Sequence, residues 1–244
     1  MQLKKELEDY RILLRSIPSL VIAVFVVSVI MMNLLANKEF ISMKYLALDS
    51  GFLLSWVGFL CMDIICKRFG PKAAAKISIM AILFNLCACF MFWVVSLSPG
   101  MWGEYYSTNE MMVNDALNKT IGGSWYIVLG SSVAMACAAF TNSFLNHTIA
   151  KRLKMDNFKA FATRSFVSTG VAQFVDNFVF SIIVSVHFFG WTWTQVFFCS
   201  LTGAVMELLF EILFGPIGYR ICKNWERENV GEQYIRYREE RSMI

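Results

Sequence analysis

Long runs of apolar residues, separated by short polar segments, make up most of the chain. They predict six helices, which cover about residues 17–37, 46–66, 73–97, 123–150, 165–188 and 192–219. Pro18 lies in the first turn of the first run, Ser98-Pro99-Gly100 ends the third, and Gly190 separates the fifth from the sixth. Such residues commonly mark the start or the end of a helix. We therefore expect an all-α protein.

The lengths of these runs match a lipid bilayer. No Lys, Arg, Asp or Glu occurs in residues 16–37, 77–103 or 120–150, and about 20 helical residues suffice to cross the hydrocarbon core. Of the 244 residues, 57% are hydrophobic and only 16% are charged, whereas a soluble domain is about one quarter charged. The sequence predicts a membrane protein whose six transmembrane helices form a single bundle over 17–219. Segment 1–16 and the tail 220–244 lie outside it.

Lys and Arg are unevenly distributed between the segments that join the runs. Nineteen of the 22 lie in the N-terminal segment, in the loops that follow the second and fourth runs, and in the C-terminal tail. The other connections carry only Lys38, Lys44 and Lys119. Because cytoplasmic segments carry the excess of Lys and Arg, we expect both termini to be cytoplasmic. The net charge of +4 then reflects topology, and no nucleic-acid partner is expected.

Catalytic and metal-binding motifs are missing from the sequence. The seven cysteines show no CxxC spacing, and the two histidines lie on different segments, so we expect buried thiols and neither a metal site nor a cofactor. There is no P-loop, nucleophile elbow or HExxH motif. We therefore do not expect an enzyme, although a membrane-embedded enzyme with buried carboxylates is one alternative. A structural or partner-binding membrane protein is another.

Two segments outside the runs carry mixed charges. The loop 98–122 is polar, acidic and aromatic, and we expect it to be a solvated loop, with a partly ordered cap over the outer mouth as the alternative. The tail after Lys223 contains charges of both signs, and we expect a helical extension in the cytoplasm.

The fifth run contains a stripe of polar residues near its middle. Gln173, Asp176 and Asn177 are spaced so that they share one face of a helix with Phe180. A charged side chain at mid-depth in a bilayer costs about 2.5–3.5 kcal/mol on insertion scales, so this face should point into the bundle. It is a candidate binding site for a solute. The alternative is a polar cluster that only holds neighbouring helices together.

The sixth run contains two carboxylates, Glu207 and Glu211, one helical turn apart. Two such groups on one helix face in a medium of low dielectric constant cannot both ionise cheaply. They could donate or accept hydrogen bonds to a solute, carry a proton, or stabilise packing through a cation. Gly215-Pro216 follows, and we expect it to interrupt the helix.

Other polar residues are candidates for secondary roles. Asp63 and Lys67 are four residues apart at the end of the second run, with Arg68 next to them. They favour an ion pair that anchors the helix end, and a role in gating is the alternative. Asn85 and Asn142 supply neutral hydrogen-bonding groups to the interior. The aromatic residues Trp56, Phe84 and Phe178 could stack on a planar ligand.

Four stretches of the chain resemble one family of membrane proteins. They are "MNLLANKE" at 32–39, "DIICKRFG" at 63–70, "RSFVSTGVAQFVDNFVF" at 164–180 and "GPIGYR" at 215–220. They are similar to sequences of the queuosine-precursor transporters, also called the vitamin uptake transporter (VUT) family. By motif, Asp63, Arg68, Gln173 and Asp176 correspond to family positions. Glu207 departs from the pattern, because many members have a Lys there.

The resemblance implies a six-helix importer in the inner membrane that supplies tRNA modification. Its solute would be 7-cyano-7-deazaguanine, 7-aminomethyl-7-deazaguanine or a related base. Such a base presents two N–H donors beside a carbonyl acceptor, and a carboxylate can accept from both donors. The alternative within transport is another vitamin or nucleobase, carried by the chain alone or captured for a larger complex. Membrane lipid is an expected partner, and a homo-oligomer is left open.

Overall fold

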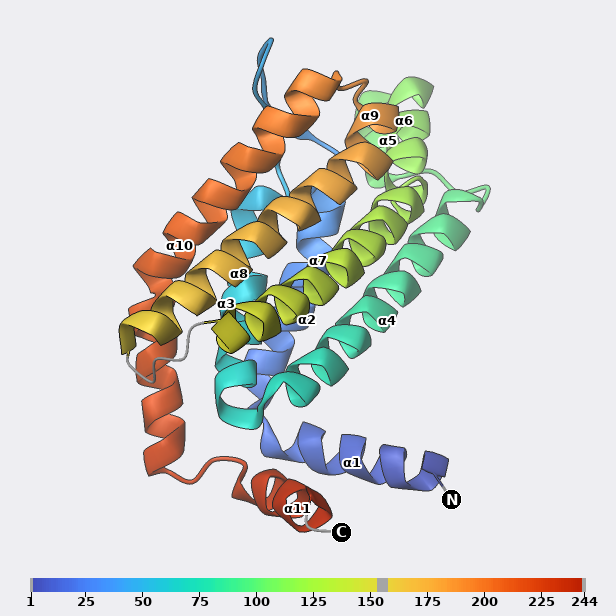
Figure 1. Cartoon of the computed structure of the whole chain (residues 1–244). Coiled ribbons are helices and arrows are strands. Elements are labelled where there is room, and N and C mark those ends of the chain that lie inside the picture. The colour runs from blue at the N-terminus through green and yellow to red at the C-terminus, as the bar shows by residue number, and fades with distance from the viewer. Residues whose placement is uncertain (1, 153–157, 243–244) are drawn as a thin grey trace. The chain divides into compact units, whose positions relative to one another are not determined.

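The computed structural model describes residues 2–152 and 158–242, without the side chains of residues 2–4, 143, 146, 147, 150–152, 158–166, 211, 241 and 242 (Figure 1). Its helices are α1 (Gln2–Ser16), α2 (Ser19–Leu35), α3 (Phe52–Phe69), α4 (Pro71–Ser96), α5 (Gly103–Thr108), α6 (Met111–Gly122), α7 (Trp125–Arg152), α8 (Phe158–Phe180), α9 (Val186–Phe188), α10 (Trp193–Arg227) and α11 (Glu232–Ser242). A π-helical turn, η1 (Ser181–Ser185), joins α8 to α9, and strands β1 (Glu39–Ser42) and β2 (Ala47–Asp49) form an antiparallel hairpin.

Each of the six predicted runs contains a long helix, so the expected helical architecture is confirmed. Within the described residues, four stretches are long and apolar enough to cross a membrane, namely Pro71–Ser96, Met111–Asn142, Val167–Phe188 and Trp193–Phe210. A fifth arises if α1 and α2, which meet at a bend of 104°, are counted as one broken span. These helices define a multi-pass membrane protein with four to five candidate spans.

The second predicted run also falls short of these criteria of length and apolar composition. Its helix, α3, has 18 residues, but Asp63, Lys67 and Arg68 lie in its last two turns. Charged side chains there leave a shorter apolar stretch than a bilayer core needs.

The chain divides into two compact units. Unit 1 comprises residues 1–31, 54–85 and 210–244, and unit 2 comprises residues 32–53 and 86–209. Several long helices therefore contribute to both units, and α10 passes from unit 2 to unit 1 after Leu209.

Unit 1 is organised around the turn between α3 and α4. Gly70 adopts a left-handed φ of 88° and Pro71 opens the next helix, a common way to stop one helix and start another. Phe69, which is 2% exposed, packs its ring against Trp225 and Tyr234. The C-terminal helix α11 is thereby held against this turn.

Two expectations about local structure are wrong. The segment 98–122 is not a solvated loop, because it forms α5 and α6, and the Trp102 indole donates a hydrogen bond to Asn118 at 2.7 Å. Gly215-Pro216 does not interrupt α10, which continues to Arg227. The expected helical character of the tail after Lys223 is confirmed in the described residues, as the last turn of α10 to Arg227 and as α11 from Glu232.

The packing of Gly231 against Phe69 can be tested by adding one methyl group. Gly231 and Gly190 both have a left-handed φ, of 72° and 67°, so alanine should cost about 1–2 kcal/mol at either position. A Cβ at Gly231 would also lie 2.1 Å from the Phe69 ring, whereas a Cβ at Gly190 meets nothing within 4 Å. Gly231→Ala should therefore lose about 1–3 kcal/mol more than Gly190→Ala through overpacking. Thermal unfolding of both variants in detergent measures this difference, and equal losses would contradict the packing.

Candidate functional site

The polar stripe of the fifth run lies on α8, within unit 2, and it contacts α10. Gln173 is 3% exposed and Glu207 on α10 is 6% exposed. The Asn177 amide nitrogen donates to the Gln173 backbone carbonyl at 3.0 Å and to Glu207 Oε2 at 3.1 Å. One amide therefore links a turn of α8 to a carboxylate of α10. Sequence reasoning named these residues on separate helices, and the structure brings them together.

A glycine makes this contact between α8 and α10 close. A Cβ at Gly203 would lie 3.2 Å from three atoms of the Asn177 amide group, Cγ, Nδ2 and Oδ1. Such a separation is tighter than ordinary van der Waals contact. Glycine at this position lets the backbone of α10 approach the Asn177 side chain.

Asp176 lies beside this pair and has a different environment. Its side chain is half-buried, and among the described residues no cation and no hydrogen-bond donor contacts its carboxylate. Ionised carboxylates in lipid usually pair with a cation or face a cavity that holds water or a ligand. Asp176 therefore has hydrogen-bonding capacity that the described chain does not use.

Two buried amide oxygens add to this capacity. Gln173 Oε1 and Asn142 Oδ1 are buried and have no hydrogen-bond partner among the described residues. Asn142 lies on α7, which runs antiparallel to α8, and a Cβ at Gly130 would lie 2.4 Å from Val184. This pairing places Asn142 close to the level of Gln173 along α8. Buried polar atoms without partners are uncommon in folded proteins and call for an explanation.

The π-helical turn η1 lies beyond the polar stripe and was not predicted. Within it, the Val186 N–H reaches back five residues to the Ser181 carbonyl. The Ile183 carbonyl in this turn accepts a hydrogen bond from the Tyr126 hydroxyl of α7. Such turns occur frequently at functional sites. The sequence holds no clear signal for it, because "SIIVSV" is compatible with an ordinary α-helix.

The residues considered for an ion pair or a gate lie in unit 1. Within the described residues no salt bridge joins Asp63 to Lys67, although Lys67 acts on the Asp63 carboxylate electrostatically. The ion pair and the gating role therefore stay predictions. The Lys67 ammonium group lies over the Tyr219 ring, 4.7 Å from its centroid. The Arg68 guanidinium donates to the Val230 backbone carbonyl through Nε at 3.1 Å and Nη2 at 3.0 Å. Arg68 therefore secures the connection between α10 and α11.

Two further candidates also belong to unit 1. Asn85 is buried on α4, and Glu211 lies on α10, with a side chain outside the described part of the structure. Neither is placed relative to the Asn177–Glu207 pair, which belongs to unit 2.

The three aromatic candidates have different surroundings. The Trp56 ring stacks on Phe214 in unit 1, with centroids 4.2 Å apart, so that face of the indole is occupied. Phe178 stacks on Phe174 at 5.6 Å, one turn along the helix that carries Asp176. Phe84 is exposed. Of the three, Phe178 is the ring on the same helix as the polar stripe.

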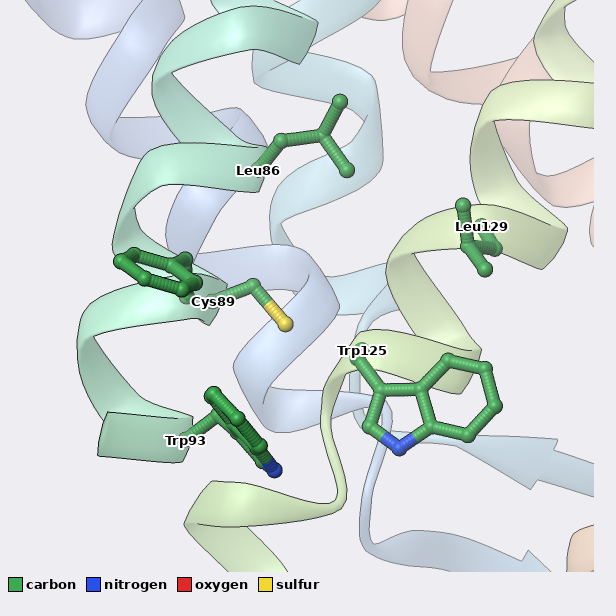
Figure 2. A pocket seen from close by; sticks show the side chains of 6 residues that line it. Leu86, Cys89, Trp93, Trp125 and Leu129 are labelled. Atoms are coloured by element: carbon green, nitrogen blue, oxygen red, sulfur yellow. The ribbon is translucent and has the colours of Figure 1, made fainter. Parts of the chain in front are cut away.

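An apolar pocket of about 340 Å³ lies elsewhere in unit 2. It is lined by side chains of α4 and α7, namely Leu86, Cys89, Phe90, Trp93, Trp125 and Leu129 (Figure 2). It contains none of the predicted site residues and offers no carboxylate or amide. We therefore do not assign this pocket to a polar solute.

Asp49 is a carboxylate at the end of the hairpin, outside the candidate spans. Burial raises the pKa of Asp49 to about 6. Its Oδ1 accepts a hydrogen bond from the Gly51 backbone N–H at 2.8 Å.

Within the described residues, no group of three or more His, Cys, Asp or Glu side chains could hold a metal ion.

The fold and the site thus define a multi-pass membrane protein with hydrogen-bonding groups buried between its helices. Comparison with known families identifies the family to which the chain belongs. The model of the family described as "putative vitamin uptake transporter" matches residues 49–221, which is more than half of the chain, so the chain belongs to this family. Comparison with curated proteins and with solved structures found no significant match.

The contact between Gly203 and Asn177 generates a prediction about stability. Alanine raises helix propensity by about 1 kcal/mol at an interior glycine, so Gly170→Ala, whose Cβ would make only ordinary contact with Leu208 at 3.8 Å, serves as the matched control. Gly203→Ala should push the Asn177 amide away from Glu207 and lose about 1 kcal/mol relative to the control. That loss corresponds to roughly 2–4 °C in Tm, which thermal unfolding in detergent would detect. An equal or higher Tm for Gly203→Ala would show that the contact is not tight.

Proposed function

We propose that the protein imports a small planar base of the 7-deazaguanine type, a queuosine precursor, across the inner membrane. The observation that carries the proposal is a group of hydrogen-bond acceptors buried on neighbouring helices of unit 2. The described residues leave the Asp176 carboxylate and the Gln173 and Asn142 amide oxygens without donors. The family assignment supports transport of a vitamin-like solute.

The chemistry of the base complements these groups. A deazaguanine edge presents two adjacent N–H donors, and a carboxylate accepts from both in a bidentate pair that is stronger than neutral hydrogen bonds. In our proposal Asp176 takes this role, while Gln173 and Asn142 contact further polar atoms of the base. Glu207 is held by Asn177 at 3.1 Å and would fix the position of α8 against α10.

The proposed topology has six transmembrane spans with both termini in the cytoplasm. In addition to the four candidate spans, α2 and α3 would cross the bilayer. The 17 residues of α2 are at the lower limit for a span, and the charged end of α3 would lie at the cytoplasmic interface. The distribution of Lys and Arg between the connecting segments supports this orientation.

Other solutes of the same chemical kind are the main alternative. Acceptor oxygens buried in a membrane protein would suit another vitamin or nucleobase that carries N–H donors. In the proposal the chain acts in transport rather than catalysis.

Asp176→Asn tests the proposed site directly. The substitution keeps the shape of the side chain but replaces a charged acceptor with a neutral amide, and a lost hydrogen bond to a charged group is worth about 1.5–3 kcal/mol. We expect uptake of radiolabelled 7-cyano-7-deazaguanine at sub-saturating concentration to fall at least tenfold, measured in cells that lack precursor synthesis and their own importer. Membrane abundance is measured in parallel.

Asp115→Asn is the matched control, because Asp115 is an exposed carboxylate on α6. This variant should transport normally. Wild-type uptake by Asp176→Asn at equal abundance would remove Asp176 from the site. Absence of uptake by the wild type, with competition by another vitamin or nucleobase, would favour the alternative solute.

A separate experiment decides whether α3 crosses the membrane. Single cysteines are introduced at Lys44 and Lys72, on either side of α3, in a variant without the seven native cysteines. Six spans predict that a membrane-impermeant maleimide reacts from outside at position 44 and, in intact cells, spares position 72. Labelling of both positions from outside, or protection of both, would mean that α3 does not cross. A single cysteine introduced at Tyr106, which is exposed on α5, provides the reference for labelling from outside.

A further inference from the structure

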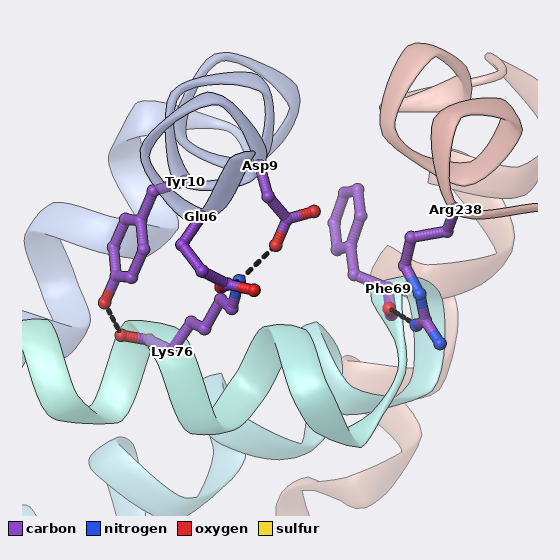
Figure 3. A network of polar contacts seen from close by, with 6 residues as sticks. All are labelled: Glu6, Asp9, Tyr10, Phe69, Lys76 and Arg238. Atoms are coloured by element: carbon purple, nitrogen blue, oxygen red, sulfur yellow. Dashed lines mark hydrogen bonds and ion pairs between the residues drawn. The ribbon is translucent and has the colours of Figure 1, made fainter. Parts of the chain in front are cut away.

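The N-terminal helix α1 is held against the start of α4 by polar contacts. The Lys76 ammonium group of α4 pairs with Glu6 at 2.8 Å and with Asp9, and the Tyr10 hydroxyl donates to the Lys76 backbone carbonyl (Figure 3). Leu13, Asp9 and Ser16 are buried on the same side of α1. All of these residues belong to unit 1. The helix therefore has a defined orientation and is not a free tail.

The direction of α1 suits the plane of a membrane surface. It meets α2 at 104°, so that α1 runs nearly perpendicular to a helix whose apolar sequence predicts a span. Its contact point on α4, Lys76, lies five residues after the start of a candidate span at Pro71. At 1.5 Å per residue this is about 8 Å along the span, which is within the thickness of the headgroup region and its boundary with the acyl chains.

The face of α1 that the bundle leaves free is both apolar and basic. Leu7 is 62% exposed and Leu14 is 38% exposed, and Arg11 and Arg15 are exposed between and beside them. Lys76 pairs with both Glu6 and Asp9, so that two of the three acidic side chains of α1 are matched. The free face is consequently positive.

The apolar edge of this face points toward the middle of α4. In Figure 3, Tyr10 contacts α4 on the side away from Phe69, whereas Asp9 lies nearer the Phe69 turn. Leu7 precedes Tyr10 by three residues and Leu14 follows it by four, so both leucines share the Tyr10 side of the helix. Arg11 and Arg15 come next around the helix. The leucines thus face the candidate span and the arginines lie beside them. This pattern is typical of a helix that lies in a membrane interface.

We propose that α1 is an interfacial helix that inserts Leu7 and Leu14 into the acyl-chain boundary and binds the phosphate groups of anionic phospholipids through Arg11 and Arg15. Arginine binds phosphate through a fork of N–H donors. Basic side chains at this depth are attracted to anionic lipids. The inference rests on unit 1 and on the membrane location of the chain, and it is independent of the solute.

Spin labels on the full-length protein measure the depth of each face. Leu7→Cys, Leu14→Cys and Glu8→Cys are made in the variant without native cysteines, and the labelled proteins are reconstituted in vesicles of phosphatidylcholine and phosphatidylglycerol. We expect labels at 7 and 14 to be at least threefold less accessible to a water-soluble nickel relaxation agent than the label at 8, and more accessible to oxygen. Equal nickel accessibility at all three positions would overturn the proposal.

A second measurement addresses the arginines. Phosphatidylglycerol, added to wild-type protein in neutral detergent, should raise Tm by several degrees, and the double variant R11Q/R15Q should lose most of that shift. The control is the double variant K223Q/R227Q, which removes two exposed basic residues near the end of α10 and should retain it. An unchanged shift in R11Q/R15Q would show that anionic lipid does not bind through α1. If the control lost the Tm shift to the same extent, the shift would depend on net charge alone, and the specific site on α1 would also be rejected.

Discussion

A helix in a bilayer has no water to satisfy its polar groups, and this constraint underlies most of the structure. Each buried donor or acceptor needs a partner within the protein or in a ligand. In unit 2 the Asn177 amide supplies one such partner by joining the Gln173 carbonyl of its own helix to Glu207 on α10. Gly203 makes the approach close enough. The same constraint makes the unused acceptors at Asp176, Gln173 and Asn142 informative, because a structure built only for stability would have paired them.

The same constraint applies in unit 1, where charged side chains rather than amides act as the partners of buried polar groups. Two arginines bind backbone carbonyls at or between helix ends, where carbonyls lack intrahelical partners, and one lysine binds carboxylate side chains. Arg68 binds the Val230 carbonyl, Arg238 binds the Phe69 carbonyl at 3.0 Å, and Lys76 binds two carboxylates of α1. These contacts connect both chain termini to the turn between α3 and α4. The Arg68 contact also gives one of the charged residues in the last turns of α3 a structural role.

The helical architecture was predictable because it depends on composition over long stretches. Runs of about 20 apolar residues have few alternatives to helix in lipid, and Pro18 and Gly190 marked boundaries correctly. Local structure outside the runs was less accessible. The hairpin β1–β2 has only seven strand residues, and α5 and α6 are stabilised by tertiary contacts such as the Trp102 indole on Asn118. Neither leaves a strong periodic signal. Pro216 was expected to break α10 because the local penalty was weighed without the packing that keeps the helix continuous.

For the candidate site, residue types were easier to predict than contacts. Helical spacing shows which residues share a face, and it correctly suggested that Gln173 and Asn177 lie close together on α8. It cannot show which face of α10 meets α8, so the hydrogen bond from Asn177 to Glu207 required the structure. Helical spacing placed Asp63 and Lys67 within electrostatic range of each other, but it did not show that the Lys67 ammonium group lies over the Tyr219 ring. An exposed i, i+4 ion pair is worth only about 0.3–0.5 kcal/mol, and contact of the ammonium group with the Tyr219 ring is of comparable strength. Contacts of such similar energy are chosen by tertiary packing rather than by sequence spacing.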